Sequence, residues 1–386
     1  MRKKALYIGF KRDYVNKYLE LSLSVLGNCF DLNFYGPGYS KSQEIEDGIN
    51  SWLKNQNEYD ILFIDPFIVI HENKLTLQEF TRNMKMNILY YGYDDFYDNV
   101  DSYKNFFFDS PKTKVIIGVY DYHAINNNLI KYIVESNSLV ISVFGKNLND
   151  SLENTKKKYG ESDFYDMAIS DSWYEFECNY KERIISFPHA VFTNEFNNTP
   201  IGSRKYIFSV VGVLYPERKK AAKFLPLEQR LLLFFKRLII YIKTKTGLNQ
   251  ITPKKLNHYF FSYNKTISNS KLVYCSGSPL MYSVRKYFEI PSKGSVSIGW
   301  PCNGFQHLGF KDKENFIIAK NNSELEEAFL NYSEIELQKI ATNGLKLIWE
   351  HHSDYARTEQ MKKTFSLIFS GKFKGSYWKN GEYLFF

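Results

Sequence analysis

The fold of this chain of 386 residues is limited above all by short apolar runs that alternate with longer polar or amphipathic segments. Several runs are rich in β-branched residues and apolar at almost every position, which is typical of parallel strands covered by helices on both faces. In the first half of the chain we expect strands at residues 5–10, 29–36, 60–65, 85–92, 114–121, 138–145 and 183–188. Repeated units of this kind predict an α/β fold with sites at the carboxyl ends of the strands.

A second series of apolar runs begins near residue 205. Its expected strands are residues 205–213, 271–277, 295–300 and 315–320, with YFFSY at 259–263 as an uncertain addition. The segment NEFNNTPIGS between the two series is polar and rich in turn-forming residues. We therefore predict a first Rossmann-like unit at 1–198 and a second at 199–350, with their parallel sheets facing a cleft.

Shorter signals mark the ends of elements in the last third of the chain. Ser323 and Glu326 have the spacing of a helix capping box. Asn380-Gly381 between two aromatic runs predicts a β-hairpin turn.

Composition excludes several classes of protein. A hydrophobic share of 44% and a charged share of 24% indicate a folded globular protein and not a disordered one. The four cysteines form no CxxC motif, which argues against a zinc knuckle or a disulfide scaffold. No signal peptide is evident, because the apolar run that follows Lys4 is too short for one. The run at 231–242 should not span a membrane, because Lys236 and Arg237 interrupt it. We expect a cytoplasmic protein.

The net charge of +8 is concentrated in one region of the chain. Residues 204–265 contain 14 Lys or Arg and only two acidic residues, a balance of +12. Such a window suggests an anionic partner, namely nucleotide phosphates, an acidic membrane surface or nucleic acid. Within it, residues 218–247 fit either a helix lying on anionic lipid or a helix packed into the second unit, and we favour inward packing for most of it.

Arg285 and Glu289 lie four residues apart on an expected helix that is entered through SPLMYSVRKYFE. A surface ion pair is one interpretation of this spacing. A nucleotide site is the other, because Gly277 precedes the helix and a Pro-to-Gly segment ends it beside the next strand. The helix N-terminus would then face a phosphate, and Glu289 would accept hydrogen bonds from ribose hydroxyls.

The segment containing these residues resembles a known family. RKYFEIPSKG, SELEEAF and the closing NGLKLIWEHHSDYAR are similar to the C-terminal half of CgeB-like glycosyltransferases, GT-B enzymes related to glycosyltransferase group 1. The resemblance covers the last third of the chain and rests elsewhere on the βα pattern and ISFPHAVFTNEF. It implies two Rossmann-like units, with residues 351–386 forming a helix and tail that return to the first.

The same resemblance implies roles for particular residues. Gly212 would end the first strand of the second unit, and Arg218 would neutralise the donor diphosphate. The nucleotide side would be lined by three further residues, Gly277, Tyr282 and Arg285, and Arg285 would also stabilise charge on the departing diphosphate. Group 1 retaining enzymes often carry a second Glu eight positions before the ribose Glu, whereas this chain has Met281 there. The retaining mechanism therefore does not transfer directly.

An inverting enzyme also needs a base that takes the proton of the acceptor hydroxyl. Asp94 and His123 are the main candidates for this base, and each follows an expected strand. Further acidic or imidazole groups in comparable positions are Asp95, Asp121 and His189. A retaining enzyme would need no such base, so the stereochemistry stays open.

The sequence therefore predicts a metal-independent hexosyltransferase-like enzyme without a cofactor. It would move a sugar from a nucleotide-diphosphate sugar to a glycan or lipid-linked acceptor in cell-surface polysaccharide synthesis. The enzyme would work in the cytoplasm. An anionic membrane surface is a further candidate partner, with peripheral binding at the inner face of the cell membrane, and nucleic acid is not an expected partner. The alternatives are a non-enzymatic binder of anionic surfaces or nucleic acid, and a GT-B sugar-nucleotide epimerase or hydrolase.

Overall fold

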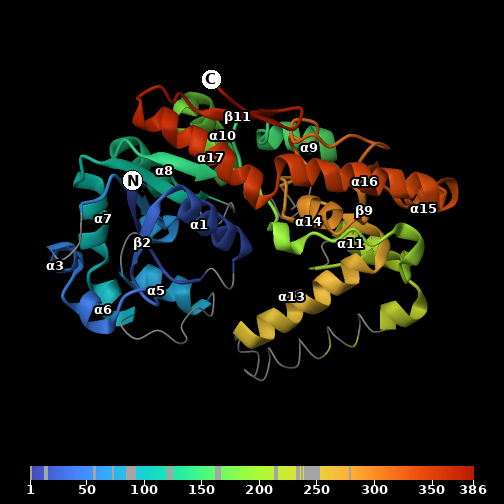
Figure 1. Ribbon diagram of the computed structural model, residues 1–386, viewed down its shortest axis with the longest axis horizontal. Helices are drawn as coiled ribbons and strands as arrows, with labels where there is room; N and C mark the ends of the chain where they lie inside the picture. The colour runs from blue at the N-terminus through green and yellow to red at the C-terminus, as the bar shows by residue number, and fades with distance from the viewer. Residues whose placement is uncertain are drawn as a thin grey trace.

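Two parallel β-sheets and the helices around them make up the protein (Figure 1). The computed structural model describes residues 2–12, 16–54, 58–71, 74–83, 93–119, 125–160, 167–212, 216–231, 235, 238, 253–277 and 280–386. The predicted α/β class with two parallel sheets, the layout of the GT-B fold, is confirmed. The strand expected at 85–92 lies outside the described residues.

The first sheet has the order β2-β1-β3-β4-β5-β6, and all its neighbouring strands run parallel. Its strands are β1 (Lys4–Ile8), β2 (Asp31–Tyr35), β3 (Ile61–Ile64), β4 (Thr113–Val119), β5 (Leu139–Ser142) and β6 (Ile184–Ser186). The strand order reverses beside β1, because β2 lies on one side of β1 and β3 on the other. Side chains that follow β1 and β3 therefore lie at the point where parallel sheets commonly bind ligands.

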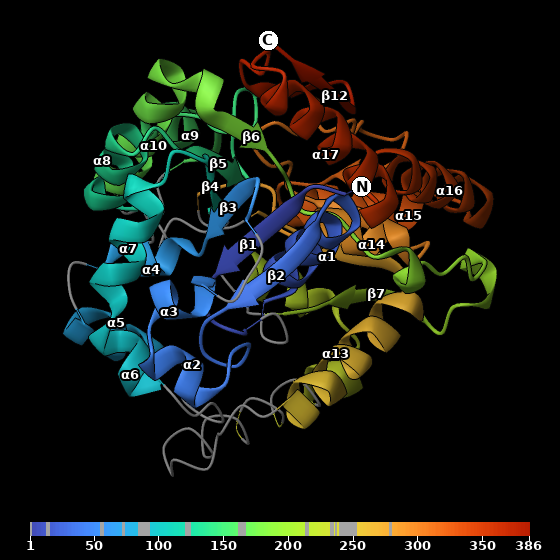
Figure 2. The ribbon, with the colours of Figure 1, turned by 60° about the vertical axis from the view of Figure 1, so that its left-hand side comes forward.

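Helices connect and cover the strands of the first sheet. They are α1 (Lys17–Cys29), α2 (Ser42–Glu46), α3 (Ile49–Lys54), α4 (Pro66–Ile70), α5 (Lys74–Asn83), α6 (Tyr93–Asp98), α7 (Val100–Asp109), α8 (Asn127–Glu135), α9 (Leu152–Tyr159) and α10 (Met167–Asn179). Figure 2 shows α1 on one side of this sheet, with α4 and α7 on the other. Burial on both faces explains why all four residues of β3 are apolar.

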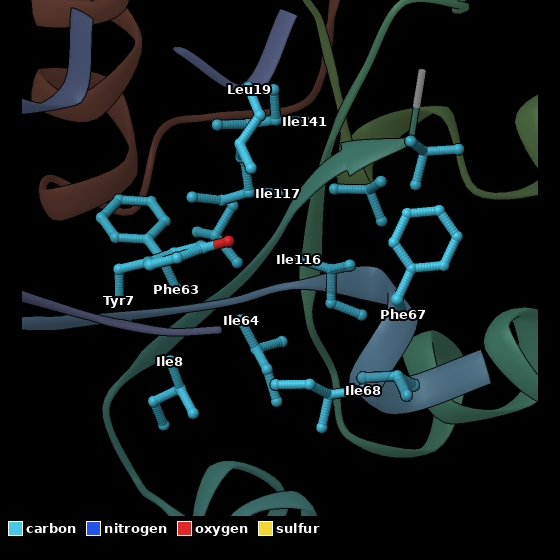
Figure 3. Close-up of a cluster of buried hydrophobic side chains, with 14 of the residues drawn as sticks. Tyr7, Ile8, Leu19, Phe63, Ile64, Phe67, Ile68, Ile116, Ile117 and Ile141 are labelled. Atoms are coloured by element: carbon cyan, nitrogen blue, oxygen red, sulfur yellow. The ribbon is translucent and has the colours of Figure 1, made fainter. Parts of the chain in front are cut away.

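The core of the first sheet is made of aliphatic and aromatic side chains from strands and helices together (Figure 3). The side chains labelled in the figure are Tyr7, Ile8, Leu19, Phe63, Ile64, Phe67, Ile68, Ile116, Ile117 and Ile141. All of them are at most 2% exposed. Removing a side chain of this size from water stabilises the fold by about 1.5–3 kcal/mol.

The second sheet has the order β10-β9-β8-β7, again with parallel neighbours. Its strands are β7 (Tyr206–Val210), β8 (Ser270–Cys275), β9 (Val296–Gly299) and β10 (Ile317–Ile318). The helices beside it are α11 (Pro216–Ala221), α13 (Pro253–Ser268), α14 (Lys286–Ser292), α15 (Asn322–Asn331) and α16 (Glu334–His351). The uncertain strand at 259–263 is wrong, because these residues form part of α13.

The C-terminal helix α17 (Asp354–Phe369) packs against α1 of the first sheet. Figures 1 and 2 both show α17 beside α1, while α16 lies over the second sheet. Phe365 supplies part of this contact, with its ring centroid 4.7 Å from that of Phe30. The chain therefore begins and ends on the same sheet, although α16 belongs to the other.

The link between α16 and α17 is tied to both parts of the molecule by buried polar contacts. His352 is fully buried, and its Nε2 lies 2.8 Å from the carbonyl oxygen of Leu308. Arg357 Nη2 lies 3.2 Å from His352 Nδ1 and donates to the carbonyl oxygens of Pro188 and His189. Because these partners come from distant segments, the pair fixes the direction in which the chain returns.

Two of the local signals have clear outcomes. The hairpin is confirmed, since β11 (Ser376–Lys379) and β12 (Glu382–Phe385) pair around Asn380 and Gly381, both with positive φ. The capping box at Ser323 is wrong, because the helix cap lies two residues earlier, at Asn321, whose side chain accepts the hydrogen bond from Glu324 N. Asparagine satisfies the free amides of a first helical turn as well as serine does.

Candidate functional site

Two glycines end adjacent strands of the second sheet at its carboxyl edge. Gly212 follows β7 and has φ of +84°, a conformation that glycine adopts without strain. A Cβ on Gly212 would collide with Lys286 Nζ and would lie 3.8 Å from Arg218 Nη1. Gly277 follows β8, and its missing side chain leaves room for the backbone of Met281, whose Cα would lie 3.0 Å from a Cβ there. Both glycines thus allow other groups to approach the ends of the strands.

Two cationic side chains, one buried and one half-buried, lie together beside Gly212. Arg218 of α11 is 2% exposed, and it is held by Ser276, with Nε 3.2 Å from Oγ and Nη2 3.1 Å from the carbonyl oxygen. Lys286, the first residue of α14, reaches the same place. In the part of the chain that the structure describes, no carboxylate forms an ion pair with Lys286. Two like charges at a buried strand edge favour the binding of an anion.

The electrostatics of Lys286 agree with this arrangement. Burial, reinforced by the positive charge of Arg218, lowers the pKa of Lys286 to about 7, despite smaller opposing effects of Cys275 and Glu289. A bound anion would supply the missing opposite charge and favour the protonated amine. The sequence did not single out Lys286, because a lysine next to an arginine at the start of a helix is usually exposed to solvent. The approach of its ammonium group to Gly212 distinguishes Lys286 from an ordinary surface lysine.

Glu289 lies in the middle of α14 and is 6% exposed. Its Oε1 accepts a hydrogen bond from Arg285 Nε at 2.5 Å, and its Oε2 accepts one from the hydroxyl of Tyr263 at 3.0 Å. Each carboxylate oxygen can accept a second hydrogen bond, so both retain capacity for a further hydroxyl donor. Tyr263 belongs to α13 and had no signal in the sequence, because the contact joins residues from two separate helices.

Arg285 is held by carboxylates on both sides. Its Nη2 donates to both oxygens of Glu195, at 2.9 and 2.8 Å, in addition to the bond from Nε to Glu289. Burial alone would lower the pKa of Arg285, but the carboxylates of Glu289 and Glu195 outweigh it and raise the pKa above its ordinary value. In this structure the guanidinium therefore orients Glu289 and joins α14 to the short helix Thr193–Glu195.

The helix that carries Glu289 is shorter than the sequence predicted. Residues 280–284 are not helical, Met281 has a positive φ of 57°, and α14 begins only at Lys286. The helix start expected soon after Gly277 thus lies further along the chain, and residues 281–284 are irregular. Tyr282 in this irregular segment packs its ring edge-to-face on Phe144 of the first unit, with centroids 5.3 Å apart. This contact places Tyr282 where the two parts of the chain meet.

The catalytic candidates are mostly beyond what the structure describes. Asp94 lies in α6, but its side chain is outside the described part, as are Asp121 and His123 entirely. His189 is described, and burial together with Arg285 and Arg357 lowers its pKa to about 3. An imidazole with so low a pKa is a poor general base near pH 7, because it holds a transferred proton too weakly.

Another acidic residue follows β3 at the point where the order of the first sheet reverses. Asp65 is fully buried, and its oxygens accept hydrogen bonds from Arg12 Nη2 and Nε and from the Tyr7 hydroxyl. It also accepts one from Phe67 N and so caps α4. These four interactions make Asp65 a structural residue of the first unit.

Other reactive groups are sparse in the described residues. The buried thiols of Cys275 and Cys302 have pKa values raised by burial, to about 12 for Cys275, so neither is an activated nucleophile. Within the described ranges, no three His, Cys, Asp or Glu side chains gather in a way that could hold a metal ion. No described helix has the length and apolar character needed to cross a bilayer.

Comparisons with known proteins give distant structural similarity only. No family model matches the chain, and no curated protein matches its sequence. Among solved structures, Anabaena Alr3699/HepE in complex with UDP and glucose has 10% identity over 94% of this chain and 99% of its own, with a TM-score of 0.46. A glycosyltransferase from Rickettsia africae ESF-5 has 11% identity over 95% and 99%, with a TM-score of 0.47. The pneumococcal O-GlcNAc transferase GtfA, with UDP and GlcNAc, has 10% identity over 83% and 60%, and a TM-score of 0.34. At these values the similarity assigns no function to this chain.

Proposed function

We propose that the protein is a GT-B glycosyltransferase of the CgeB-like type, which transfers a sugar from a nucleotide-diphosphate sugar to a hydroxyl of a glycan or glycolipid. The second unit (199–350) would bind the donor, and the first (1–198) would present the acceptor. The observation that carries the proposal is the arrangement at the carboxyl edge of the second sheet. There a buried carboxylate with spare acceptor capacity lies on the same short helix as a half-buried lysine that lies beside the buried Arg218.

In this proposal the diphosphate lies against Arg218 and Lys286, and the absent side chain of Gly212 lets the lysine reach the end of the strand. Ser276 holds the guanidinium of Arg218 in place, and charge-assisted hydrogen bonds to phosphate are among the stronger ones. Two cations here would also stabilise the negative charge that develops on the departing diphosphate. Transfer is then assisted by side chains that are already in position before the donor binds.

The ribose would be bound by Glu289, whose two oxygens suit two neighbouring hydroxyls. Arg285 and Tyr263 hold the carboxylate in one orientation, so little conformational freedom is lost on binding. Arg285 therefore acts as a positioning residue, and the phosphate contact that the sequence suggested for it passes to Lys286. Gly277 would let the chain turn close to the nucleotide.

Calorimetry on the full chain tests this assignment with UDP-, GDP-, ADP- and CMP-sugars. We expect one donor class to bind, and Glu289→Ala and Arg218→Ala each to weaken its affinity by about tenfold or more, the loss of one charged hydrogen bond. Lys346→Ala, an exposed lysine of α16, is a matched control that should leave binding unchanged. Unchanged affinity in both site variants would refute the donor site.

The products distinguish transfer from the alternatives. A transferase should consume the donor quickly only when an acceptor is present, whereas an epimerase or hydrolase would consume it alone. A non-enzymatic binder of anionic polymers would show affinity that falls steeply with salt and does not respond to nucleotide sugars. Consumption of the donor without an acceptor, or salt-dependent binding that ignores nucleotide sugars, would contradict the proposed transferase activity.

A further inference from the structure

Burial lowers the pKa of several lysines in the described part of the chain, and one of them has unusual surroundings. Three of these lysines donate a hydrogen bond to a backbone carbonyl oxygen, namely Lys104 to His71, Lys114 to Phe108 and Lys293 to Glu195. Lys286 belongs to the same group, but its amine makes no hydrogen bond or ion pair with the described residues. Within these residues the amine of Lys286 is thus held by neither a carboxylate nor a carbonyl oxygen.

The amine of Lys286 lies at the carboxyl end of β7. The absent side chain of Gly212 admits it there, since a Cβ on this glycine would collide with Nζ. Arg218 reaches the same place, with Nη1 3.8 Å from that Cβ position. Arg218 is buried, whereas Lys286 is half-buried and its Nζ is not one of the enclosed polar atoms. A small solute that reaches the amine therefore meets a guanidinium beside it.

These surroundings activate the amine as a nucleophile. A lysine becomes nucleophilic when it is partly desolvated and lies next to another cation, because both conditions favour the neutral amine. Burial and the charge of Arg218 lower the pKa of Lys286 to about 7, so about half of its amines are neutral at pH 7. An exposed lysine with an ordinary pKa is neutral in only about 0.04% of molecules at that pH.

We propose that Lys286 is a site of covalent acylation and that acyl phosphates are the compounds with which it reacts. Arg218 binds the phosphoryl group through charge-assisted hydrogen bonds, and this holds the acyl carbon near Lys286 Nζ. The neutral amine attacks that carbon, a C–N bond forms, and the C–O bond to the phosphate breaks. One proton passes from the amine to the departing phosphate, which leaves as hydrogen phosphate, and an amide remains on Lys286. Arg218 stabilises the negative charge of the leaving group.

The groups around the amine explain why an acyl phosphate is the reagent. An uncharged ester gains nothing from Arg218, whereas an anionic acyl phosphate is concentrated beside the amine before it reacts. Cys275 and Glu289 are the other titratable groups near Lys286. Burial raises the pKa of the Cys275 thiol to about 12, so this thiol does not compete for the acyl group.

Acylation would weaken donor binding, a consequence that rests on the proposed function. The amide carries no charge, so the diphosphate would lose one of its two cations. A bound donor would in turn protect Lys286, because its phosphates occupy Arg218 and favour the protonated amine. Acylation and donor binding would therefore exclude one another.

Peptide mass mapping of the full-length protein tests the proposal. The protein is incubated with acetyl phosphate at pH 7, and the acetylated fraction of each lysine is followed over time. We expect Lys286 to react about tenfold faster or more than the exposed Lys320 and Lys346, because its larger neutral fraction outweighs its lower basicity. Arg218→Met should slow the acetylation of Lys286 about tenfold, since the phosphate contact and the neighbouring cation are both lost.

Internal controls separate activation from general reactivity. Lys293 is buried as well, but its amine is bonded to Glu195, so it should react no faster than Lys320. Equal rates at Lys286 and Lys320 would overturn the proposal. So would a fast reaction of Lys286 with p-nitrophenyl acetate but not with acetyl phosphate, which would assign the reactivity to uncharged esters.

Calorimetry measures the effect on donor binding separately. Acetylated wild-type protein should bind its nucleotide sugar about tenfold or more weakly than untreated protein. Lys286→Arg keeps a positive charge without the reactive amine, so the same treatment should not change its affinity. If Lys286 reacts fast and no UDP-, GDP-, ADP- or CMP-sugar binds, the acylation site stands and the donor assignment fails. If a nucleotide sugar binds while Lys286 reacts only as fast as Lys320, the acylation proposal fails and the donor site stands.

Discussion

Lys286 provides the sharpest test of the donor site, because binding of a diphosphate should change the protonation state of its amine. Burial and Arg218 lower its pKa to about 7 in the unliganded protein. A bound diphosphate sugar would favour the protonated amine, so the complex should take up a proton when it forms above that pH. The affinity should therefore fall as pH rises through 7, and Lys286→Met should remove this dependence.

The size of the effect follows from the titration. With a pKa of about 7, roughly nine-tenths of the lysine is protonated at pH 6 and roughly one-tenth at pH 8. If only the protonated form binds phosphate well, the dissociation constant rises about tenfold between these two values. At pH 6 Lys286→Met should cost about 1.5–3 kcal/mol, the value of a hydrogen bond to a charged group, which corresponds to about 10- to 150-fold in affinity.

Calorimetry at pH 6, 7 and 8 measures the affinity, and repetition in buffers of different ionisation enthalpy measures the proton uptake. A nucleotide-diphosphate sugar is the required ligand, because its two phosphates do not titrate in this range, unlike the terminal phosphate of a free diphosphate. Lys320→Met, an exposed lysine just after β10, is the matched control and should keep the wild-type pH profile. A pH dependence that persists in Lys286→Met, or its absence in the wild type, would refute the reasoning.

Two further predictions concern the charged and imidazole groups that hold the site and the chain return. Arg285→Met should lower the free energy of unfolding by about 1.5–3 kcal/mol in denaturant titrations, because Glu289 and Glu195 lose their shared, largely buried partner while Lys293 stays near Glu195; a loss below about 0.5 kcal/mol would contradict the ion network. His352 has a pKa lowered well below 6.5 by burial and by Arg357, so only the unfolded chain takes up its proton as pH falls below 6.5. Stability should decrease there by up to about 1.4 kcal/mol per pH unit, less steeply in His352→Gln but not in His351→Gln. Equal slopes in both variants would argue against a neutral buried His352.

The regular elements could be predicted because their signals are local. An uninterrupted apolar run such as 61–64 suits a strand covered on both faces, and it forms the fully buried strand β3. Asn380-Gly381 suits the positive φ of both turn residues, so the hairpin follows from two neighbouring residues. Where two local signals compete, as Asn321 and Ser323 do for the start of α15, the sequence alone could not decide.

Long-range contacts could not be predicted in the same way. The bond from Tyr263 to Glu289 joins two helices, and the contact of Lys286 with Gly212 joins residues more than 70 positions apart. The pairing of Arg285 with Glu289 could be predicted from their spacing on one helix. The second partner of Arg285, Glu195, could not, because it lies in the segment between the two sheets. That second carboxylate changes the proposed role of Arg285 from binding a phosphate to orienting Glu289.

The sequence by itself determined the α/β class, the two series of parallel strands and the concentration of positive charge at 204–265, because periodicity and charge are properties of neighbouring residues. The tertiary structure alone decided which charges meet. It placed Lys286 beside Arg218 and enclosed Arg285 between two carboxylates. The physical reason is that burial and the proximity of charges, which set pKa values and binding capacity, arise only when distant segments pack together.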